Sequence, residues 1–237
     1  MFAEVLSGKT RLLDLAYAIN DKLVPWPGDV RWFEARTNAS FATVGFFTRH
    51  FWMLEHYGTH LDAPIHFARG KPTVDQIPPQ QFFGPAVVLD VRAEGAANAD
   101  YQAPATLIDA WEAQHGPIPP GSIVLLRTGW SSRWPDVQTY RNQDASGKMH
   151  FPGFSVAAVE CCIARGVSGL GCDTMSVDIG ASEDFAVHHL ALGAGLYHLE
   201  NLADLSALPE RGAWLIVAPI KLEGGSGGPA RVFALLP

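Results

Sequence analysis

The segment between residues 84 and 173 constrains the fold most, because apolar stretches of strand length alternate there with stretches of helix length. Three stretches have the pattern of buried strands: GPAVVLDVR, GSIVLLRTGW and VSGLGCD. Between them, TLIDAWEAQHG has Thr106 as a candidate N-cap and Gly116 after its end, and SVAAVECCIARG is bounded by Ser155 and Gly166. This β-α-β-α-β order predicts a partly parallel sheet covered by helices.

Strand patterns flank this central segment on both sides. The first 60 residues contain RLLDLAYAI, VRWFEAR and FFTRHFWMLEH, and the tail contains GAWLIVAPIKL and ARVFALL around a glycine-rich loop. Residues 130–154 are polar and aperiodic, which is typical of a lid or binding loop. Nothing in the composition marks a linker. We therefore expect one α/β domain over residues 1–237, with a mixed, partly parallel sheet, helical cover and flanking β-strands.

The composition excludes several classes of partner. The net charge is −7 and no run of Lys or Arg occurs, which argues against nucleic acid and against an anionic membrane surface. The N-terminal segment lacks the pattern of a signal peptide, and no apolar run approaches the roughly 20 residues of a membrane span. The three cysteines include the adjacent Cys161 and Cys162, which fit reduced thiols on a helix. These features predict a cytoplasmic protein with a small-molecule partner.

The stretch EHYGTHLDAPIHF, residues 55–67, concentrates three of the nine histidines around one aspartate. Imidazole and carboxylate together are a recurring ligand set for zinc, manganese or iron. A turn through Gly58 would point His56 and His60 at one centre, and Pro64 favours extended geometry before it, which places Asp62 beside His60. The pattern therefore predicts a divalent metal site. Hydrogen-bonded histidines without an ion are the alternative.

Three other enzyme patterns are weaker. A zincin needs H-E-x-x-H, but Tyr, Gly and Thr separate His56 from His60. The facial triad of a non-haem iron oxygenase is matched by His60, Asp62 and a distant His188, although His56 and His66 then have no role. GGSGG, residues 224–228, matches the G-x-S-x-G of serine hydrolases, but no helix, histidine or acid follows it, so Ser226 is not expected to be a nucleophile.

HYGTHLDAPIHF resembles the H-x-G-T-H-x-D-x-P-x-H-[FY] signature of the cyclase-like metal-dependent hydrolases, a family that includes bacterial kynurenine formamidase and isatin hydrolase. The resemblance extends over nearly the whole chain. DLAYAINDKLVPWPGD is similar to the family's opening, GCDTMSVDIG to its G-x-D-T-x-S-x-D segment, and VHHLALGAGLYHLEN to its second metal-side segment. TVDQIP, HFPGFS and the ending APIKLEGGSGGPARVFALL are more similar to the isatin hydrolase branch.

The resemblance implies a fold of the swivelling β/β/α type, a homodimer or higher oligomer, and roles for individual residues. His56, His60 and Asp62 match the metal ligands. His188 and Glu200 match the distant histidine and glutamate that complete the site in members with two ions; otherwise the site holds one ion. His66 resembles the catalytic acid/base. Asp173 and Asp178 are expected to shape the loop or to accept hydrogen bonds from metal-bound imidazoles.

The activity that the resemblance implies is hydrolysis of a small aromatic or cyclic amide, such as opening of an isatin-like ring to a carboxylate. A Mn²⁺ or Zn²⁺ ion would lower the pKa of water from 15.7 to about 7 and so supply hydroxide, and His66 would move the proton to the leaving nitrogen. We expect Trp26, Phe47 and Trp52 to form a flat slot for the substrate. N-formylkynurenine hydrolysis, an iron oxygenase and a non-catalytic binding protein are the alternatives.

Overall fold

Three parallel strands form the centre of the computed structural model, which describes residues 7–8, 10–28 and 33–237. They are β5 (Phe83–Asp90), β7 (Ile123–Arg127) and β9 (Gly169–Cys172), paired in that order. The helices α4 (Ala105–His115) and α6 (Val156–Ala164) connect them, so the expected β-α-β-α-β order is confirmed. The side chain of Ser155 caps α6 as expected, whereas α4 begins after Pro104 and not at Thr106.

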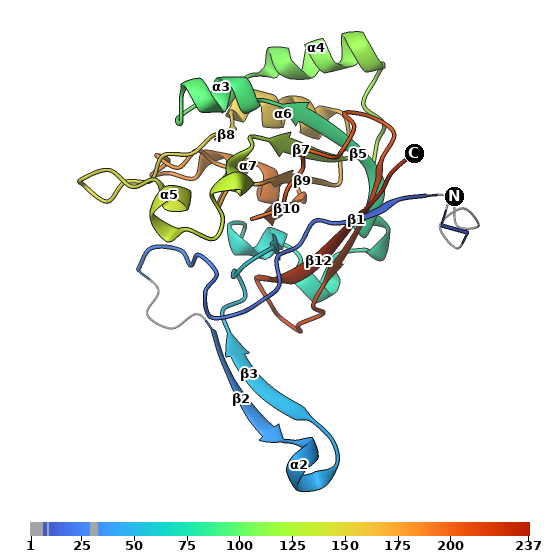
Figure 1. Ribbon diagram of the computed structural model, residues 1–237. Helices are drawn as coiled ribbons and strands as arrows, with labels where there is room; N and C mark the ends of the chain where they lie inside the picture. The colour runs from blue at the N-terminus through green and yellow to red at the C-terminus, as the bar shows by residue number, and fades with distance from the viewer. Residues whose placement is uncertain (1–6, 9, 29–32) are drawn as a thin grey trace.

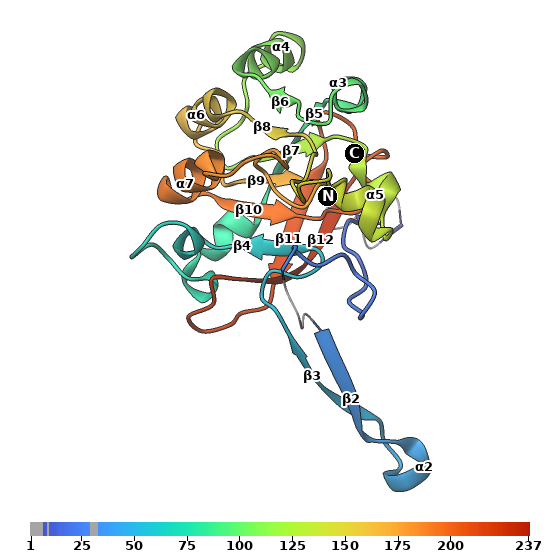
Figure 2. The same cartoon turned by 90° about the vertical axis from the view of Figure 1, so that its left-hand side faces the viewer.

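Two further elements extend this unit toward the C-terminus. The helix α7 (Ala186–Gly193) leads into β10 (Tyr197–Glu200), which pairs in parallel with β9. Figure 2 shows α4, α6 and α7 stacked side by side along one face of the strands. None of the described helices is long and apolar enough to cross a membrane.

The sheet closes on itself, and this corrects the expectation of an open mixed sheet. The long strand β12 (Gly227–Leu235) pairs through residues 230–235 with β11 (Trp214–Pro219) and through residues 227–229 with β4 (His60–Asp62). Since β11 also pairs with β5 and β4 with β10, seven strands of the described chain form a closed, barrel-like ring. β1 (Leu12–Asp14) is an additional edge strand on β12. The sequence pattern of β12 did not indicate that this strand pairs with two different partners.

The closed sheet has one hydrophobic core inside the ring and another between its outer face and the helices. Val88 and Leu125 point into the ring, together with Leu61 of β4 and Leu199 of β10. Their neighbours along β5 and β7, such as Val87 and Leu126, point outward and pack against helix residues such as Ile108 of α4 and Val159 of α6. Both faces of β5 and β7 are therefore buried, which explains why these strands are continuous apolar runs rather than alternating ones.

The N-terminal region differs from the strand prediction. Only Leu12–Asp14 of the first expected strand is extended, and residues 30–32 of the second lie outside the described residues, as do residues 1–6 and 9 of the N-terminal segment. β2 (Phe33–Ala39) and β3 (Thr48–Met53) pair only with each other, with the short helix α2 (Phe41–Val44) at the tip. This hairpin projects away from the body (Figure 1).

Residues 130–154 are folded and do not form the expected lid. They contain η4 (Trp130–Arg133), α5 (Val137–Arg141) and β8 (Gly153–Phe154), and β8 pairs with β6 (Gln102–Ala103). Tyr140 and Phe151 are fully buried. The other short elements are α3 (Arg92–Ala97), η1 (Pro64–His66), η2 (Val74–Gln76) and η3 (Pro79–Phe82).

The closure depends on a glycine where β12 meets β4. A Cβ atom added to Gly227 would lie 2.6 Å from Leu61 O and 2.6 Å from His56 Cε1. We therefore expect Gly227→Ala to lower the free energy of unfolding by about 1–3 kcal/mol, since backbone and ring must move apart. Urea denaturation followed by circular dichroism measures this. Gly193→Ala is the matched control, because Gly193 lies in a helix with open space around it. This substitution should not lower the free energy of unfolding.

Candidate metal centre

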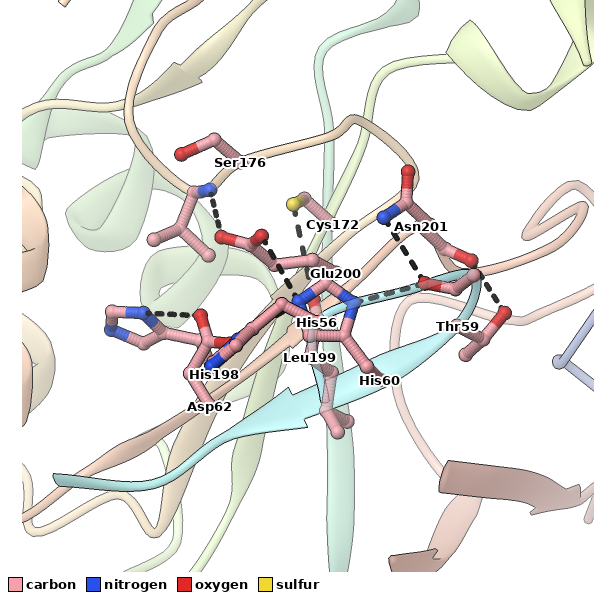
Figure 3. Close-up of polar contacts among 12 residues, drawn as sticks. His56, Thr59, His60, Asp62, Cys172, Ser176, His198, Leu199, Glu200 and Asn201 are labelled. Carbon is pink, nitrogen blue, oxygen red and sulfur yellow. Dashed lines mark hydrogen bonds and ion pairs between the residues drawn. The ribbon is translucent and has the colours of Figure 1, made fainter. Parts of the chain in front are cut away.

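The antiparallel pairing of β4 with β10 builds the site. Its register places His198 opposite Asp62 and Glu200 opposite His60. Because side chains alternate along a strand, these four point to one face while Leu61 and Leu199 point into the ring. Figure 3 shows the four side chains gathered beside β4. Each of them is at most 5% exposed.

His188 reaches the same cluster from α7, and the spacing of the donor atoms fits a metal. His60 Nε2 lies 3.2 Å from Asp62 Oδ1 and 3.6 Å from Glu200 Oε2. His188 Nε2 lies 3.4 Å from both Asp62 Oδ2 and Glu200 Oε1. Two donors bound to one zinc at 2.0–2.2 Å in a tetrahedron are about 3.3–3.6 Å apart. Buried Asp62 Oδ2 also has no hydrogen-bond partner. The cluster therefore fits a divalent cation.

Neighbouring groups orient these donors. His60 Nδ1 donates to Gly58 O at 2.9 Å, and His188 Nδ1 donates to Asp178 Oδ2 at 2.6 Å, so each ring turns its Nε2 toward the cluster. Asp178 also accepts from the backbone of Val187 and His188 at the start of α7, which fixes the helix against the site. Gly58 has a φ of 68°, as expected for the turn.

His56 lies at the edge of the cluster. Its Nδ1 is 2.6 Å from Asp62 Oδ1, and its Nε2 is 2.9 Å from Ser226 Oγ. These three residues resemble a serine protease triad in outline. However, the Ser226 hydroxyl donates to Glu55 Oε2 at 2.7 Å, as does the Ser226 backbone at 2.8 Å. Ser226 also does not line the cavity described below. It is therefore placed to hold His56 rather than to attack a substrate.

His66 lies one layer farther out, in the turn η1 after β4. Its ring stacks on that of His56 with centroids 4.0 Å apart. A donor atom of His66 lies within 4.8 Å of donor atoms of His56 and Asp62. Burial lowers the pKa of His66 to about 4, so the ring is neutral near pH 7 and able to accept a proton.

A cavity of about 480 Å³ opens onto the cluster. Its polar floor includes His60, Asp62, His66, His188 and Glu200. Its walls are largely apolar and consist of Val24, Trp26, Leu54, Phe67, Met175 and Phe185. Of the three aromatic residues expected to contact a substrate, the structure places only Trp26 here. Phe47 is on the projecting hairpin, 53% exposed, and so is Trp52, 47% exposed, so neither lines the cavity of its own chain.

Three further residues lie near the cluster. His198 was not among the predicted site residues, although alternation in the stretch YHLE places it on the same side as Glu200. Asp173 accepts from Thr128 and Ser131 and so holds the loop after β7. Burial raises the pKa of the Cys172 thiol, which is consistent with a packing role.

The comparison with known proteins agrees with this geometry. The family model described as "Putative cyclase" matches residues 13–179, more than half of the chain. The chain belongs to this cyclase family. A curated cyclase-family relative, the isatin hydrolase of Roseibium aggregatum, is 34% identical, with 99% of this chain and 95% of the relative covered. The kynurenine formamidase of Salinibacter ruber is 31% identical, with 93% and 95% covered.

A solved structure of the family superposes closely on this chain. It is the crystal structure of an isatin hydrolase bound to the product analogue thioisatinate, with a TM-score of 0.92 and 32% sequence identity. The superposition covers 100% of this chain and 96% of that chain. The fold of this cyclase-family chain is therefore that of the isatin hydrolases.

Metal binding should release protons. Burial lowers the pKa of His60, but the carboxylates of Asp62 and Glu200 outweigh this and raise the pKa to about 9. The metal-free ring is then protonated at pH 7 and must lose its proton to become a ligand. We expect the apparent affinity for Mn²⁺ to rise about tenfold per pH unit for each proton displaced, between about pH 6 and pH 8. Calorimetry in buffers of different ionisation enthalpy measures the protons released; a pH-independent affinity would contradict this.

Proposed function

We propose that this chain is a metal-dependent hydrolase that cleaves the amide bond of a small aromatic or cyclic amide, with ring opening of an isatin-like substrate to a carboxylate. The observation that carries the proposal is the cluster of His60, Asp62, His188 and Glu200 at the floor of an aromatic-walled cavity. The similarity to isatin hydrolases over the full length of the chain supports the same substrate class.

The proposed ligands are His56, His60, Asp62, His188 and Glu200. A divalent ion held by them would supply a water molecule whose pKa is near 7 and would polarise the substrate carbonyl. Imidazole nitrogen and carboxylate oxygen suit both manganese and zinc. The cluster offers more donors than the two histidines and one carboxylate of a non-haem iron oxygenase, which favours hydrolysis over oxygen chemistry.

His66 is the proposed acid/base. Its ring is neutral near pH 7 and borders the cavity, so it can accept a proton from the attacking water and return it to the leaving nitrogen. Stacking on His56 holds the plane of the ring. His60, Asp62, His188 and Glu200 are each at most 5% exposed, and burial away from water strengthens the interaction between their charges.

The lining of the cavity favours a neutral, flat substrate. Trp26, Phe67 and Phe185 provide aromatic surface, and no Lys or Arg is present among the described residues that line the cavity. The carboxylate of an amino-acid substrate such as N-formylkynurenine would therefore lack a cationic partner within this lining. We therefore propose an isatin-like amide as the substrate, with N-formylkynurenine as the second candidate.

We also propose that the chain acts as a homodimer, in which the hairpin of residues 33–53 docks on a second copy. An isolated two-stranded hairpin is marginally stable in water. This one nevertheless exposes five large aromatic side chains: Phe41, Phe46, Phe47, Phe51 and Trp52. Exposed apolar clusters of this kind mark interaction surfaces. Phe47 and Trp52 would then contribute to the substrate slot of the partner rather than to that of their own chain.

The free cysteines support a reducing compartment, and we propose that the protein is cytoplasmic.

Two substitutions separate metal binding from proton transfer. We expect His60→Ala to lose metal and activity together, because a ligand is removed. His66→Ala should retain the metal and lose about 10²- to 10⁴-fold in kcat, the usual contribution of a general acid/base. Ultraviolet assays on isatin and N-formylkynurenine, with and without chelator, and metal analysis give both quantities. His115→Ala is the control, because His115 lies in α4 and does not line the cavity. If His66→Ala kept the wild-type kcat, His66 would not be the acid/base.

Substitutions in the hairpin test the proposed dimer. We expect the wild-type protein to elute as a dimer in size-exclusion chromatography with light scattering, and Phe47→Glu/Trp52→Glu to elute as a monomer. The variant should keep its metal content, while KM rises about tenfold or more, because each buried aromatic side chain contributes about 1.5 kcal/mol or more. Val137→Glu, at an apolar position on α5 that is 39% exposed, is the control. A monomeric wild-type protein would refute the docking.

A further inference from the structure

Residues 16–28, called here the wall segment, contribute Val24 and Trp26 to the lining of the cavity but belong to no helix or strand. Among the hydrogen bonds between described residues, none joins the backbone of this segment to the backbone of another part of the chain. The sequence PWP at residues 25–27 contributes to this, because proline has no N–H to donate. Side chains must therefore hold this wall of the cavity in place.

The first part of the wall segment is held from the turn before β4. Thr59 Oγ1 accepts a hydrogen bond from the backbone of Tyr17 at 3.0 Å. The hydroxyl of Tyr57 donates to Asn20 O at 2.8 Å. Val24, farther along, is 2% exposed and packs in a small hydrophobic cluster of its own. None of these contacts acts directly on Trp26.

Arg141 acts on the residue next to Trp26. Its Nε donates to Pro25 O at 3.0 Å, and its Nη2 donates to the same oxygen. Hydrogen bonds from a charged donor are stronger than those between neutral groups. The guanidinium group therefore fixes the carbonyl that directly precedes Trp26.

Arg141 extends from a rigid base at the end of α5. The neighbouring Tyr140 is fully buried. Its hydroxyl donates to Asp173 O at 2.9 Å, and its carbonyl accepts from Trp130 Nε1 at 2.7 Å. The end of α5 is thus held to the body through several hydrogen bonds, so it can serve as a fixed point for the wall segment.

Packing alone does not fix Trp26. This residue lines the cavity above the cluster and also a second cavity of about 480 Å³, which Pro27, Met149 and Glu183 border as well. A side chain with open space around it can shift, unlike one in a close-packed core. The position of Trp26 therefore depends on the backbone that Arg141 holds.

We propose that Arg141 is a positioning residue for the proposed hydrolysis: it holds the wall segment at Pro25 and so sets Trp26 against a flat substrate. The effect on turnover rests on the proposed function, whereas the attachment of the wall segment does not. No residue of 130–154 lines the cavity, yet this region then influences how a substrate binds.

Limited proteolysis tests the attachment without using activity. Trypsin cleaves after Lys22, which is exposed, but the following Leu23 and Val24 are buried, so cleavage requires the wall segment to open. Arg141→Met retains an unbranched side chain and removes the donors. We expect it to accelerate cleavage after Lys22 by about tenfold, measured by mass spectrometry of the fragments. An unchanged rate would overturn the proposal.

Kinetics on isatin test the effect on Trp26. Arg141→Met should raise KM about tenfold at unchanged kcat and metal content, because Trp26 borders the substrate but supplies no group to the reaction. Combining it with Trp26→Ala should raise KM no further than Trp26→Ala alone. Arg141→Lys, which keeps one charged donor, should recover part of the loss and covers the case in which Arg141→Met does not fold. Additive effects of the two substitutions would contradict the assigned role.

Arg165→Met is the matched control, because Arg165 forms an ion pair with Glu112 that joins α6 to α4, away from the wall segment. It should keep the wild-type KM and the wild-type rate of cleavage after Lys22. Equal acceleration by both arginine substitutions would mean a general loss of stability and would overturn the proposal. If the wild-type protein hydrolyses neither isatin nor N-formylkynurenine, the proposed function fails, and the cleavage rates still decide whether Arg141 holds the wall segment.

Discussion

The site depends on one physical arrangement, the antiparallel pairing of β4 with β10. This register places two imidazoles and two carboxylates on one face of two short strands. Four ionisable side chains buried together would be very costly without compensation, because each charge loses its hydration. The arrangement is tolerable where opposite charges and a bound cation compensate one another. The buried cluster of ionisable side chains is therefore well suited to hold a metal ion.

The rest of the structure keeps this face rigid. The Gly58 carbonyl accepts from both His60 Nδ1 and Asn201 Nδ2, which joins the turn before β4 to the end of β10. The hydroxyl of Tyr140 lies 3.1 Å from Asn201 Oδ1, so residues 130–154 support the turn from behind. Asp178 anchors α7 and orients His188. Donor groups held in this way change little when an ion binds, which lowers the cost of binding.

In the proposed dimer, the chain and a second copy would contribute different parts of the site. The body supplies the donors, His66 and one aromatic wall with Trp26. The hairpin projects away from the body (Figure 1), and none of its exposed aromatic side chains lines that cavity. In the proposed dimer, substrate selection depends on both copies, whereas metal binding depends on one. The two functions would then respond to different substitutions.

Much of this could be predicted from the sequence, because the signals are local. Buried runs in β5 and β7, helix boundaries such as Ser155, and the turn at Gly58 follow from periodicity and from backbone preferences of neighbouring residues. The close spacing of His56, His60 and Asp62 likewise indicates a shared site within one short segment. The family resemblance added His188 and Glu200, which lie too far along the chain for local patterns to connect.

The sequence by itself determined the types of strand and helix and the chemistry of the donors. Only the tertiary structure decided that the sheet closes, that His198 joins the cluster, and that Phe47 and Trp52 lie outside the cavity. Closure and register are set by pairing between distant segments, such as β12 with β4, and the strength of such pairing depends on packing across the whole ring. A residue's own neighbours along the chain therefore cannot specify them.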